Sequence, residues 1–335
     1  MRIALDAMGG DHAPEQIVQG AVEALPLLAP GDVLTLVGPA ERLRSLLQSH
    51  HPATAGLDQI AIEHAPDVIG MHESPVEAVR HKRNSSLVRM FKLASGDAAD
   101  VLISAGNTGA LVAAGVLLLK ALPGVDRPGI AVTIPTPHGP VMLCDAGANV
   151  QPKPAHLHQY AVMTRLYMQY IHAVANPRIG LLNVGTEEEK GTPLVKEAHG
   201  LLRADPTLNY VGYTEGRSIF SGACDVLVTD GFTGNVVLKI IEGLTGSLLR
   251  GLTEQFGRIS PELLAAARKP LQCAADQYDH EEYGGALLLG LSGLVLKVHG
   301  AGGARAIKNA VKTARAASQM NINEAISRHM HAAGS

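Results

Sequence analysis

The sequence predicts an α/β protein with a doubly wound, largely parallel sheet and helices on both faces. Short apolar runs suited to strands alternate along the chain with longer segments of helical periodicity. The succession is clearest in Asp225–Lys239, where an apolar run, a small polar loop and a helical pattern follow one another. Because this succession recurs, and because it favours parallel pairing, we expect one large sheet covered on both sides.

The expected strands are short runs rich in Val, Ile, Leu and Ala. Val226–Val228 is apolar throughout, which is typical of a strand buried on both faces. Ile130–Ile134 and Val141–Cys144 bracket a proline-rich turn, so we expect these two runs to pair. In chain order the expected strands are 2–5, 33–37, 60–62, 101–104, 130–134, 141–144, 179–184, 226–228 and 294–298.

Several expected helices begin at recognisable caps. Pro14 and Pro75 suit a first helical position, and Ser74 with Glu77 has the form of a capping box. Ala110–Leu122 is apolar nearly all round, so we expect that helix to be buried. In chain order the expected helices are 14–25, 40–48, one from 75, 110–122, 154–174, 236–256, one from 261, and 304–330.

Composition indicates a globular protein of a reducing compartment. The chain has 335 residues, 46% of them hydrophobic and 18% charged, with a net charge of −3. That balance excludes the basic excess of a nucleic-acid binder. Three cysteines favour a cytoplasmic protein over a disulfide framework. No secretory signal begins the chain, and the longest apolar stretch is too short to span a bilayer, so only peripheral membrane contact remains open.

We find no linker or repeat, and predict one catalytic domain over 1–331 with a disordered tail at 332–335. Within it, five polar loops follow expected strands: 6–12, 105–109, 145–149, 185–192 and 230–235. Ligands of doubly wound sheets bind beyond the carboxyl ends of the strands, so we expect the five loops to meet at one edge. The candidate ligands of a phosphate or substrate are His12, Gly106, Asn107, Thr108, Asn149, Thr186, Asp230, Gly231, Thr233 and Gly234.

Two familiar nucleotide motifs are absent from these loops. Lys190 precedes Gly191, so the order required for a P-loop is not present. No G-x-G-x-x-G follows an expected strand with an acidic residue at the next strand end. A small inorganic or singly esterified phosphate is therefore the natural ligand.

Lys190 and Asn235 are the candidate catalytic residues. Lys190 is the only lysine in the five loops and could stabilise negative charge on phosphate or on a carbonyl oxygen. It could equally be a surface lysine that offsets Glu187 to Glu189. Asn235 could donate its amide N–H to an oxyanion, or it could cap a helix.

A cysteine nucleophile and a metal site are both poorly supported. Cys144 ends an expected strand, but no histidine is visibly paired with it, and buried cysteines usually fill apolar space. Among the fifteen histidines no spacing resembles a metal-binding motif.

Six motifs in order resemble a known family across almost the whole chain. They are D-A-M-G-G-D-H-A-P (6–14), S-A-G-N-T-G-A (104–110), D-A-G-A-N (145–149), N-V-G-T-E-E-E-K-G (183–191), D-G-F-T-G-N-V-V-L-K (230–239) and Y-G-G-A-L-L-L-G-L (283–291). The set resembles the bacterial phosphate acyltransferases of phospholipid synthesis. Leu287 departs from the proline that many members have there.

The resemblance implies a function, a fold and partners. It implies transfer of a long-chain acyl group from acyl carrier protein to inorganic phosphate, without a metal or cofactor. The acyl phosphate would serve the acyl phosphate:glycerol-3-phosphate acyltransferase of phospholipid synthesis. It also implies a homodimer with a fold like those of isopropylmalate dehydrogenase and phosphotransacetylase, with Lys190 and Asn235 aligned to the catalytic lysine and asparagine.

Two segments are candidates for contact with partners. Basic residues between Lys297 and Arg328 form either a solvated helix face or a docking surface for acidic acyl carrier protein. Leucines and basic residues in 248–269 suit peripheral contact with the inner face of the cell membrane, and a dimer interface explains the leucines equally well.

Two rival functions have less support in the sequence. A dehydrogenase of similar fold needs a nicotinamide-binding loop and, usually, paired aspartates for a metal. A non-catalytic scaffold that binds carrier protein or membrane has no reason to carry five polar loops after its strands.

Overall fold

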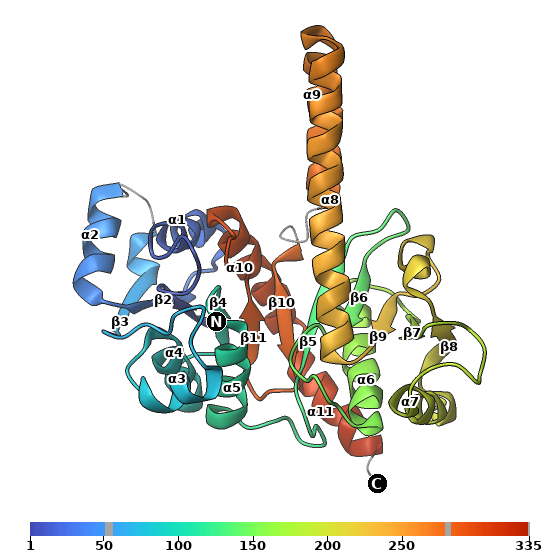
Figure 1. Cartoon of the computed structure of the whole chain (residues 1–335). Coiled ribbons are helices and arrows are strands. Elements are labelled where there is room, and N and C mark those ends of the chain that lie inside the picture. The colour runs from blue at the N-terminus through green and yellow to red at the C-terminus, as the bar shows by residue number, and fades with distance from the viewer. Residues whose placement is uncertain (51–55, 279–282, 334–335) are drawn as a thin grey trace.

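The chain folds around one eleven-stranded sheet in the order β3-β2-β1-β4-β11-β10-β5-β6-β9-β7-β8 (Figure 1). The structure is a computed structural model that describes residues 1–50, 56–278 and 283–333. The strands are β1 (Arg2–Asp6), β2 (Val33–Gly38), β3 (Ile60–His64), β4 (Val101–Ser104), β5 (Gly129–Ile134), β6 (Val141–Cys144), β7 (Arg178–Leu182), β8 (Asn209–Thr214), β9 (Val226–Val228), β10 (Ala286–Leu289) and β11 (Leu294–Lys297).

Helices cover both faces of this sheet, which confirms the predicted fold class. The helices are α1 (Glu15–Ala24), α2 (Ala40–His50), α3 (Pro75–His81), α4 (Ser86–Ser95), α5 (Thr108–Leu118), α6 (Pro154–Ile171), α7 (Pro193–Ala204), α8 (Gly231–Ile259), α9 (Pro261–Gln277), α10 (Ala304–Gln319) and α11 (Ile322–Ala333). Short 3₁₀ turns lie at Leu25–Leu27, Leu57–Gln59 and Gly216–Ser221.

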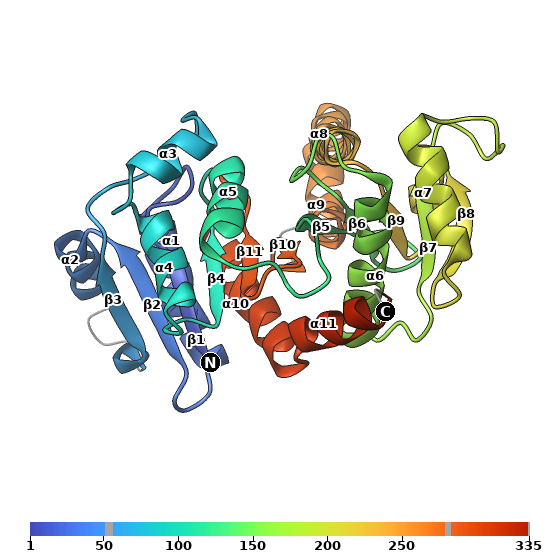
Figure 2. The same ribbon diagram turned by 90° about the horizontal axis from the view of Figure 1, so that it is seen from below.

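The two faces have separate hydrophobic cores. Buried residues of α1, α6, α7, α10 and α11 form one core with one set of strand residues. Buried residues of α3, α4 and α5 form the other, and the first turns of α8 pack against it. In Figure 2, α3, α5 and α8 accordingly lie on one side of the sheet and α10 and α11 on the other.

The sheet reverses direction at its centre. Strands β3, β2, β1, β4 and β11 are parallel to one another, and so are β6, β9, β7 and β8. Three successive antiparallel pairs join these two sets through β10 and β5. The carboxyl ends of the two parallel sets therefore lie at opposite edges of the sheet.

Some expected helices differ from those observed. The helix expected from 110 to 122 is α5, and it is not fully buried, since Val116 and Leu117 are 46% and 49% exposed. The closing helix expected over 304–330 is two helices, because Asn321 adopts a positive φ of 50° between them. Elements α4, α7, β8 and β10 were not predicted from the sequence.

The carboxyl-terminal helix runs further than expected. Helix α11 extends to Ala333, two residues into the segment predicted as a disordered tail, because two alanines follow His331 and alanine favours helix. Residues 334 and 335, the rest of that predicted tail, lie outside the described residues.

Helices α8 and α9 form a long antiparallel hairpin that projects from one face of the molecule (Figure 1). Its root lies on β5 and β6, and its far end stands clear of the sheet. Within the described residues no helix has both the length and the apolar character needed to cross a bilayer.

Candidate active site

A cavity of about 260 Å³ lies between α5 and the root of α8. Apolar and small side chains of β5 and β10 form part of its wall, and polar residues come from loops and helix ends. The polar and charged residues that line it are Asp11, Thr108, Asn235, Lys239, Glu242, Lys297 and His299. A hollow with convergent polar groups on an apolar wall is the usual form of a small-molecule site.

This cavity joins loops that leave opposite edges of the sheet. Asp11 and Thr108 follow β1 and β4, whereas Ala146 and Asn235 follow β6 and β9. The prediction that all five loops share one edge was wrong, because the antiparallel pairs at the centre reverse the second set of strands. The strands are short, however, so four of the five loops still meet across the face of the sheet. The fifth, 185–192, does not line the cavity.

Two glycines allow the amino end of α8 to lie directly on the loop that follows β6. A Cβ built on Gly234 would lie 1.9 Å from the backbone oxygen of Asp145. One built on Gly231 would lie 2.8 Å from the backbone oxygen of Asn149. No side chain fits at either position, so these predicted site residues act through the close approach that they permit.

The first turn of α8 then places Asn235 in the cavity wall. Asp230 caps the helix and accepts hydrogen bonds from the amide N–H and the hydroxyl of Thr233, at 2.9 and 2.7 Å. Asn235 is exposed and lies beside Gly147, where a Cβ would be 3.7 Å from the asparagine side chain. Asp230 and Thr233 thus hold the helix end, while the Asn235 amide faces open space.

Asp145 is fully buried and organises the loop against which α8 packs. Its carboxylate accepts hydrogen bonds from four backbone N–H groups, at 2.7–3.1 Å, those of Ile130, Gly147, Ala148 and Asn149. Burial raises the pKa of this carboxyl, and the four N–H groups oppose the rise.

The side chains of Asn107 and Asn149 are engaged within the protein. Asn107 caps α5 by accepting the Ala110 N–H at 3.0 Å, and its amide donates to backbone oxygens of the 70–73 segment. Asn149 donates to the Pro128 backbone oxygen at 2.7 Å and to the Tyr160 hydroxyl at 2.8 Å. These two predicted ligands therefore position loops with their side chains.

The loop after β4 is held by a buried carboxylate as well. Ser104 donates its hydroxyl proton to Asp6 at 2.7 Å and accepts the N–H of Gly106 at 3.0 Å. Burial raises the pKa of Asp6, and hydrogen bonds from Ser86 and Ser104 oppose the rise. This network sets the path of Gly106 into Thr108, the first residue of α5, at the cavity.

Lys297 is a cation at the cavity that the sequence did not single out as a site residue. It ends β11, and its ammonium donates to the backbone oxygens of Ala105, at 3.1 Å, and Val298. Burial lowers its pKa to about 8, although the nearby carboxylates Asp6 and Asp11 favour the charged form. The signal in the sequence was a lysine at the end of an otherwise apolar strand.

Lys239 and His299 complete the basic side of the cavity. The Lys239 ammonium pairs with Glu242 at 2.7 Å and lies 3.3 Å from Nε2 of His299. Lys239 stands four residues after Asn235 on α8, so both lie on one side of that helix.

Lys190, Thr186 and His12 lie outside this cavity lining. The Lys190 ammonium pairs with Glu187 at 2.7 Å, and that carboxylate raises the lysine's pKa. Thr186 and His12 are exposed. Strands β7 and β9 are parallel neighbours, so the loop that carries Lys190 leaves the same edge as the loop that leads to Asn235.

The sequence matches a family model described as fatty acid synthesis protein over residues 1–325. The phosphate acyltransferase of Geobacillus thermodenitrificans is 45% identical over 330 residues, which cover 97% of both chains. That of Geotalea uraniireducens is 44% identical, over 97% of this chain and 92% of the relative. The chain belongs to the fatty acid synthesis protein family. The resemblance drawn from the six motifs is confirmed, and the protein is an acyltransferase.

The fold of this chain is similar to those of solved phosphotransacetylase structures. A phosphotransacetylase from Streptococcus pyogenes aligns with a TM-score of 0.60 at 21% identity, over 95% of this chain and 94% of that one. A phosphotransacetylase from Staphylococcus aureus gives a TM-score of 0.60 at 16% identity, over 94% of each chain.

Cys144 is a poor nucleophile for this acyltransferase. It is fully buried at the end of β6, and burial raises the pKa of its thiol well above the ordinary value. Across 1–50, 56–278 and 283–333, no three His, Cys, Asp or Glu side chains cluster so that they could hold a metal ion.

Proposed function

We propose that this acyltransferase moves a long-chain fatty acyl group from acyl carrier protein to inorganic phosphate, and that the cavity at Asn235 is where the two meet. The observation that carries the proposal is the gathering of two lysines, an exposed amide and a helix amino end around one small hollow. Loops from both halves of the sheet contribute to it. Such a group of donors matches the size and charge of inorganic phosphate.

Phosphate would lie between the start of α5 and the start of α8. The first N–H groups of α5, near Thr108, have no partner within their own helix and carry the positive end of its dipole. Lys239 and Lys297 supply charge from the other side, and Asn235 supplies an amide N–H. Asp11 and Glu242 also line the hollow and keep its net charge moderate.

Acyl transfer in this site requires positioning more than activation. Phosphate is a nucleophile at neutral pH, so one of its oxygens can attack the thioester carbonyl without a protein nucleophile. The tetrahedral intermediate then expels the carrier thiolate, which leaves acyl phosphate and free carrier protein. The inert environment of Cys144 supports direct transfer without an acyl-enzyme.

We assign Lys190 and Asn235 to stabilisation of the charge that develops on the carbonyl oxygen or phosphate. Support for Asn235 is its exposed place in the cavity wall. Support for Lys190 is its loop, which leaves the sheet at the same edge as the loop that leads to Asn235. Lys190 would exchange its exposed partner Glu187 for the substrate, at little cost because exposed ion pairs are weak.

A basic stripe on α10 is the proposed docking surface for the acidic carrier protein. The basic residues between 297 and 328 do not form one surface, since Lys297 lies at the cavity and Arg315 donates to the Leu27 backbone oxygen. Lys308 and Lys312, four residues apart on α10, are partly and fully exposed, and Arg305, one turn earlier, is exposed and pairs with Asp276 of α9.

The remaining proposals concern the cellular setting. We place the enzyme in the cytoplasm as a homodimer without metal or cofactor, with peripheral contact to the inner face of the membrane through 248–269 as a second role of the α8–α9 hairpin. Acyl phosphate is a reactive mixed anhydride, so an acyl phosphate:glycerol-3-phosphate acyltransferase would have to consume it.

Incubation with acyl carrier thioester, with and without phosphate, tests this function. We expect phosphate-dependent release of free carrier protein, and acyl phosphate that hydroxylamine traps as a hydroxamate. Lys190→Ala should lower turnover by about 10²- to 10³-fold, the usual effect of removing an oxyanion donor. The exposed Lys196→Ala serves as the matched control, and both variants should keep the wild-type Tm. Release at the same rate without phosphate would refute the function, and a near-normal rate for Lys190→Ala would remove that lysine's role.

A further inference from the structure

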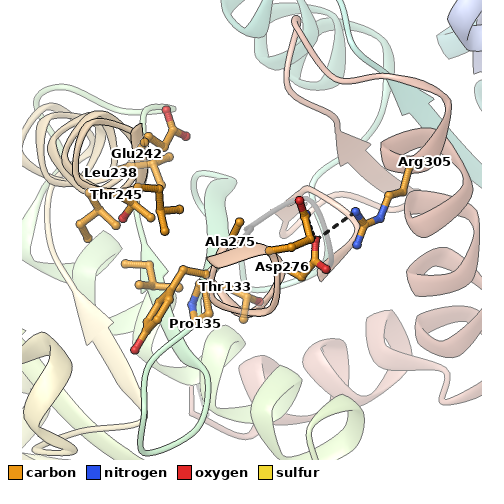
Figure 3. A pocket seen from close by; sticks show the side chains of 14 residues that line it. Thr133, Pro135, Leu238, Glu242, Thr245, Ala275, Asp276 and Arg305 are labelled. Carbon is orange, nitrogen blue, oxygen red and sulfur yellow. Dashed lines mark hydrogen bonds and ion pairs between the residues drawn. The ribbon is translucent and has the colours of Figure 1, made fainter. Parts of the chain in front are cut away.

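A second hollow, of about 320 Å³, runs along α8 from the active-site cavity toward the body of the hairpin. Figure 3 shows Leu238 and Thr245 of α8 across this hollow from Ala275 of α9, with Pro135 at the end of β5 beside them. We call it the α8 groove.

The α8 groove adjoins the cavity that holds Asn235. Leu238 and Glu242 line both hollows, so the two hollows meet at these side chains. Asn235 stands at the amino end of the helix, and the groove residues Ile241, Thr245 and Leu249 follow at helical spacing.

One side of the groove is lined mainly by apolar residues, and the other side carries charged residues. Ile134, Leu238 and Leu249 belong to the apolar part, whereas Asp276 and Arg305 form an ion pair at 3.5 Å on the far side (Figure 3). Glu242, at the end shared with the cavity, pairs with Lys239 at 2.7 Å. Because these charged groups are paired, the groove can present its apolar part to a flexible hydrocarbon.

Helix α8 carries two apolar stripes. One lies in the groove, and the other lies on the exposed surface of the hairpin. The groove residues are partly buried, whereas Ile240, Leu244 and Leu248 on another side of the helix are 60%, 57% and 58% exposed. The partly buried stripe lies in the groove and leads toward Asn235, so a chain held against it would reach the cavity.

We propose that the α8 groove holds the hydrocarbon tail of the acyl substrate, with the thioester carbonyl at Asn235 and the chain running along α8 past Thr245. The proposal rests on the proposed function for the position of the carbonyl. It makes the residue at position 245 a determinant of chain length.

Dimensions support a long chain. Thr245 lies ten residues beyond Asn235, about 15 Å along a helix that rises 1.5 Å per residue. An extended alkyl chain advances roughly 1.3 Å per carbon from ordinary bond lengths and angles, so eight carbons span about 9 Å and sixteen about 19 Å. An octanoyl chain therefore ends before Thr245, and a hexadecanoyl chain passes it.

Thr245→Trp tests the assignment, with Ser247→Trp as its matched control. Two residues turn an α-helix by about 200°, so Ser247 lies on the opposite side of α8, where it is exposed. We expect Thr245→Trp to lower kcat/KM for a hexadecanoyl carrier thioester by about 10- to 100-fold, since each methylene kept out of the groove costs about fourfold. The octanoyl thioester should stay within about twofold, and Ser247→Trp should leave both substrates unchanged.

Binding of cis-parinaric acid, a fluorescent long-chain fatty acid, provides a readout that does not depend on transfer. We expect Thr245→Trp to weaken this binding at least tenfold and Ser247→Trp to leave it unchanged. Equal losses for both chain lengths, or unchanged binding in Thr245→Trp, would overturn the groove assignment. A wild-type protein that binds the probe in this position-dependent way but shows no phosphate-dependent release would instead refute the proposed function and leave the groove standing.

Discussion

Lys297 illustrates how burial and function meet in one side chain. Its ammonium is partly buried at the end of β11, within reach of backbone oxygens and of the open cavity. The charged groups that face it are Asp6, Asp11 and Lys239, and burial outweighs the two carboxylates so that its pKa falls to about 8. Binding of a phosphate dianion would restore the missing counter-charge.

This pKa predicts a pH dependence for phosphate. As pH rises through about 8, Lys297 loses its proton, so the KM for phosphate should rise in the wild type. Lys297→Arg keeps its charge and should show a flat KM over the same range, whereas Lys297→Met should show a high and flat KM. Steady-state kinetics from pH 7 to 9.5 would measure this. A wild-type KM that stays constant across pH 8 would contradict a phosphate contact at Lys297.

Unfolding of the protein would not explain this rise in the KM for phosphate. The pKa of Lys297 is lowered from its ordinary 10.5, so the unfolded chain binds more protons than the native one between about pH 8 and 10.5. The contribution of this group to the free energy of unfolding therefore increases with pH over that window. Thermal unfolding of the same samples is the control.

Single residues also show the limit of reading a site from sequence. Asn107 and Asn149 were predicted as ligands because short polar residues follow strands, yet their side chains hold other loops in place. Lys297 was missed as a site residue because its neighbours along the chain are apolar. Whether a polar side chain faces a ligand or its own backbone depends on contacts that no local pattern contains.

At the scale of elements, α8 is the piece on which the site depends. Its amino end lies on the Asp145 loop because Gly231 and Gly234 carry no side chain. That contact places Asn235 in one hollow and the groove residues in the next.

Gly234→Ala should disrupt this contact. The added Cβ would meet the Asp145 backbone oxygen at 1.9 Å, so we expect destabilisation of about 1–3 kcal/mol and loss of activity. Gly251→Ala on the same helix has nothing within 4 Å and should instead stabilise by about 0.5–1 kcal/mol. Urea unfolding measures the free energy of unfolding of both variants and tests this prediction. If Gly234→Ala were as stable and active as Gly251→Ala, the close approach would have no role.

The sequence predicted most elements near the site but missed others for physical reasons. Runs with clear periodicity or caps, such as β9 and the start of α3, were predicted within a few residues. Strand β10 is only four residues long beside two glycines, so its run resembles a turn. Helix α5 was expected to be buried because it is apolar all round, yet periodicity cannot tell which face of such a helix meets a neighbour.

At the scale of the whole molecule, the reversal of strand direction at the centre of the sheet could not be predicted from the sequence. Alternating strands and helices predicted parallel pairing, and that holds within each half. The direction of one half relative to the other depends on the pairing of β10 with β5, two strands that lie far apart in the chain. The active-site cavity owes its position to that reversal.

The exposed stripe of α8, formed by Val236, Ile240, Leu244, Leu248 and Leu252, predicts self-association. An apolar stripe of this extent on a projecting hairpin is typical of an interface. We expect the wild type to sediment as a dimer and Leu248→Glu with Leu252→Glu to sediment as a monomer. Lys196→Glu, which changes an exposed charge on α7 and not on the hairpin, should remain dimeric.

Liposome flotation of the same variants separates the two roles of the hairpin. A double variant that stays dimeric but no longer floats with anionic vesicles would assign the stripe to the membrane and contradict the dimer interface.

The most direct test of the proposed phosphate site is the position of a bound oxyanion in a crystal soaked with arsenate, a phosphate analogue whose arsenic atom gives an anomalous signal. We expect a peak in the cavity, within hydrogen-bond distance of the Asn235 amide and the Lys297 ammonium. A peak found only beside Lys190 and Glu187, with the cavity empty, would contradict it.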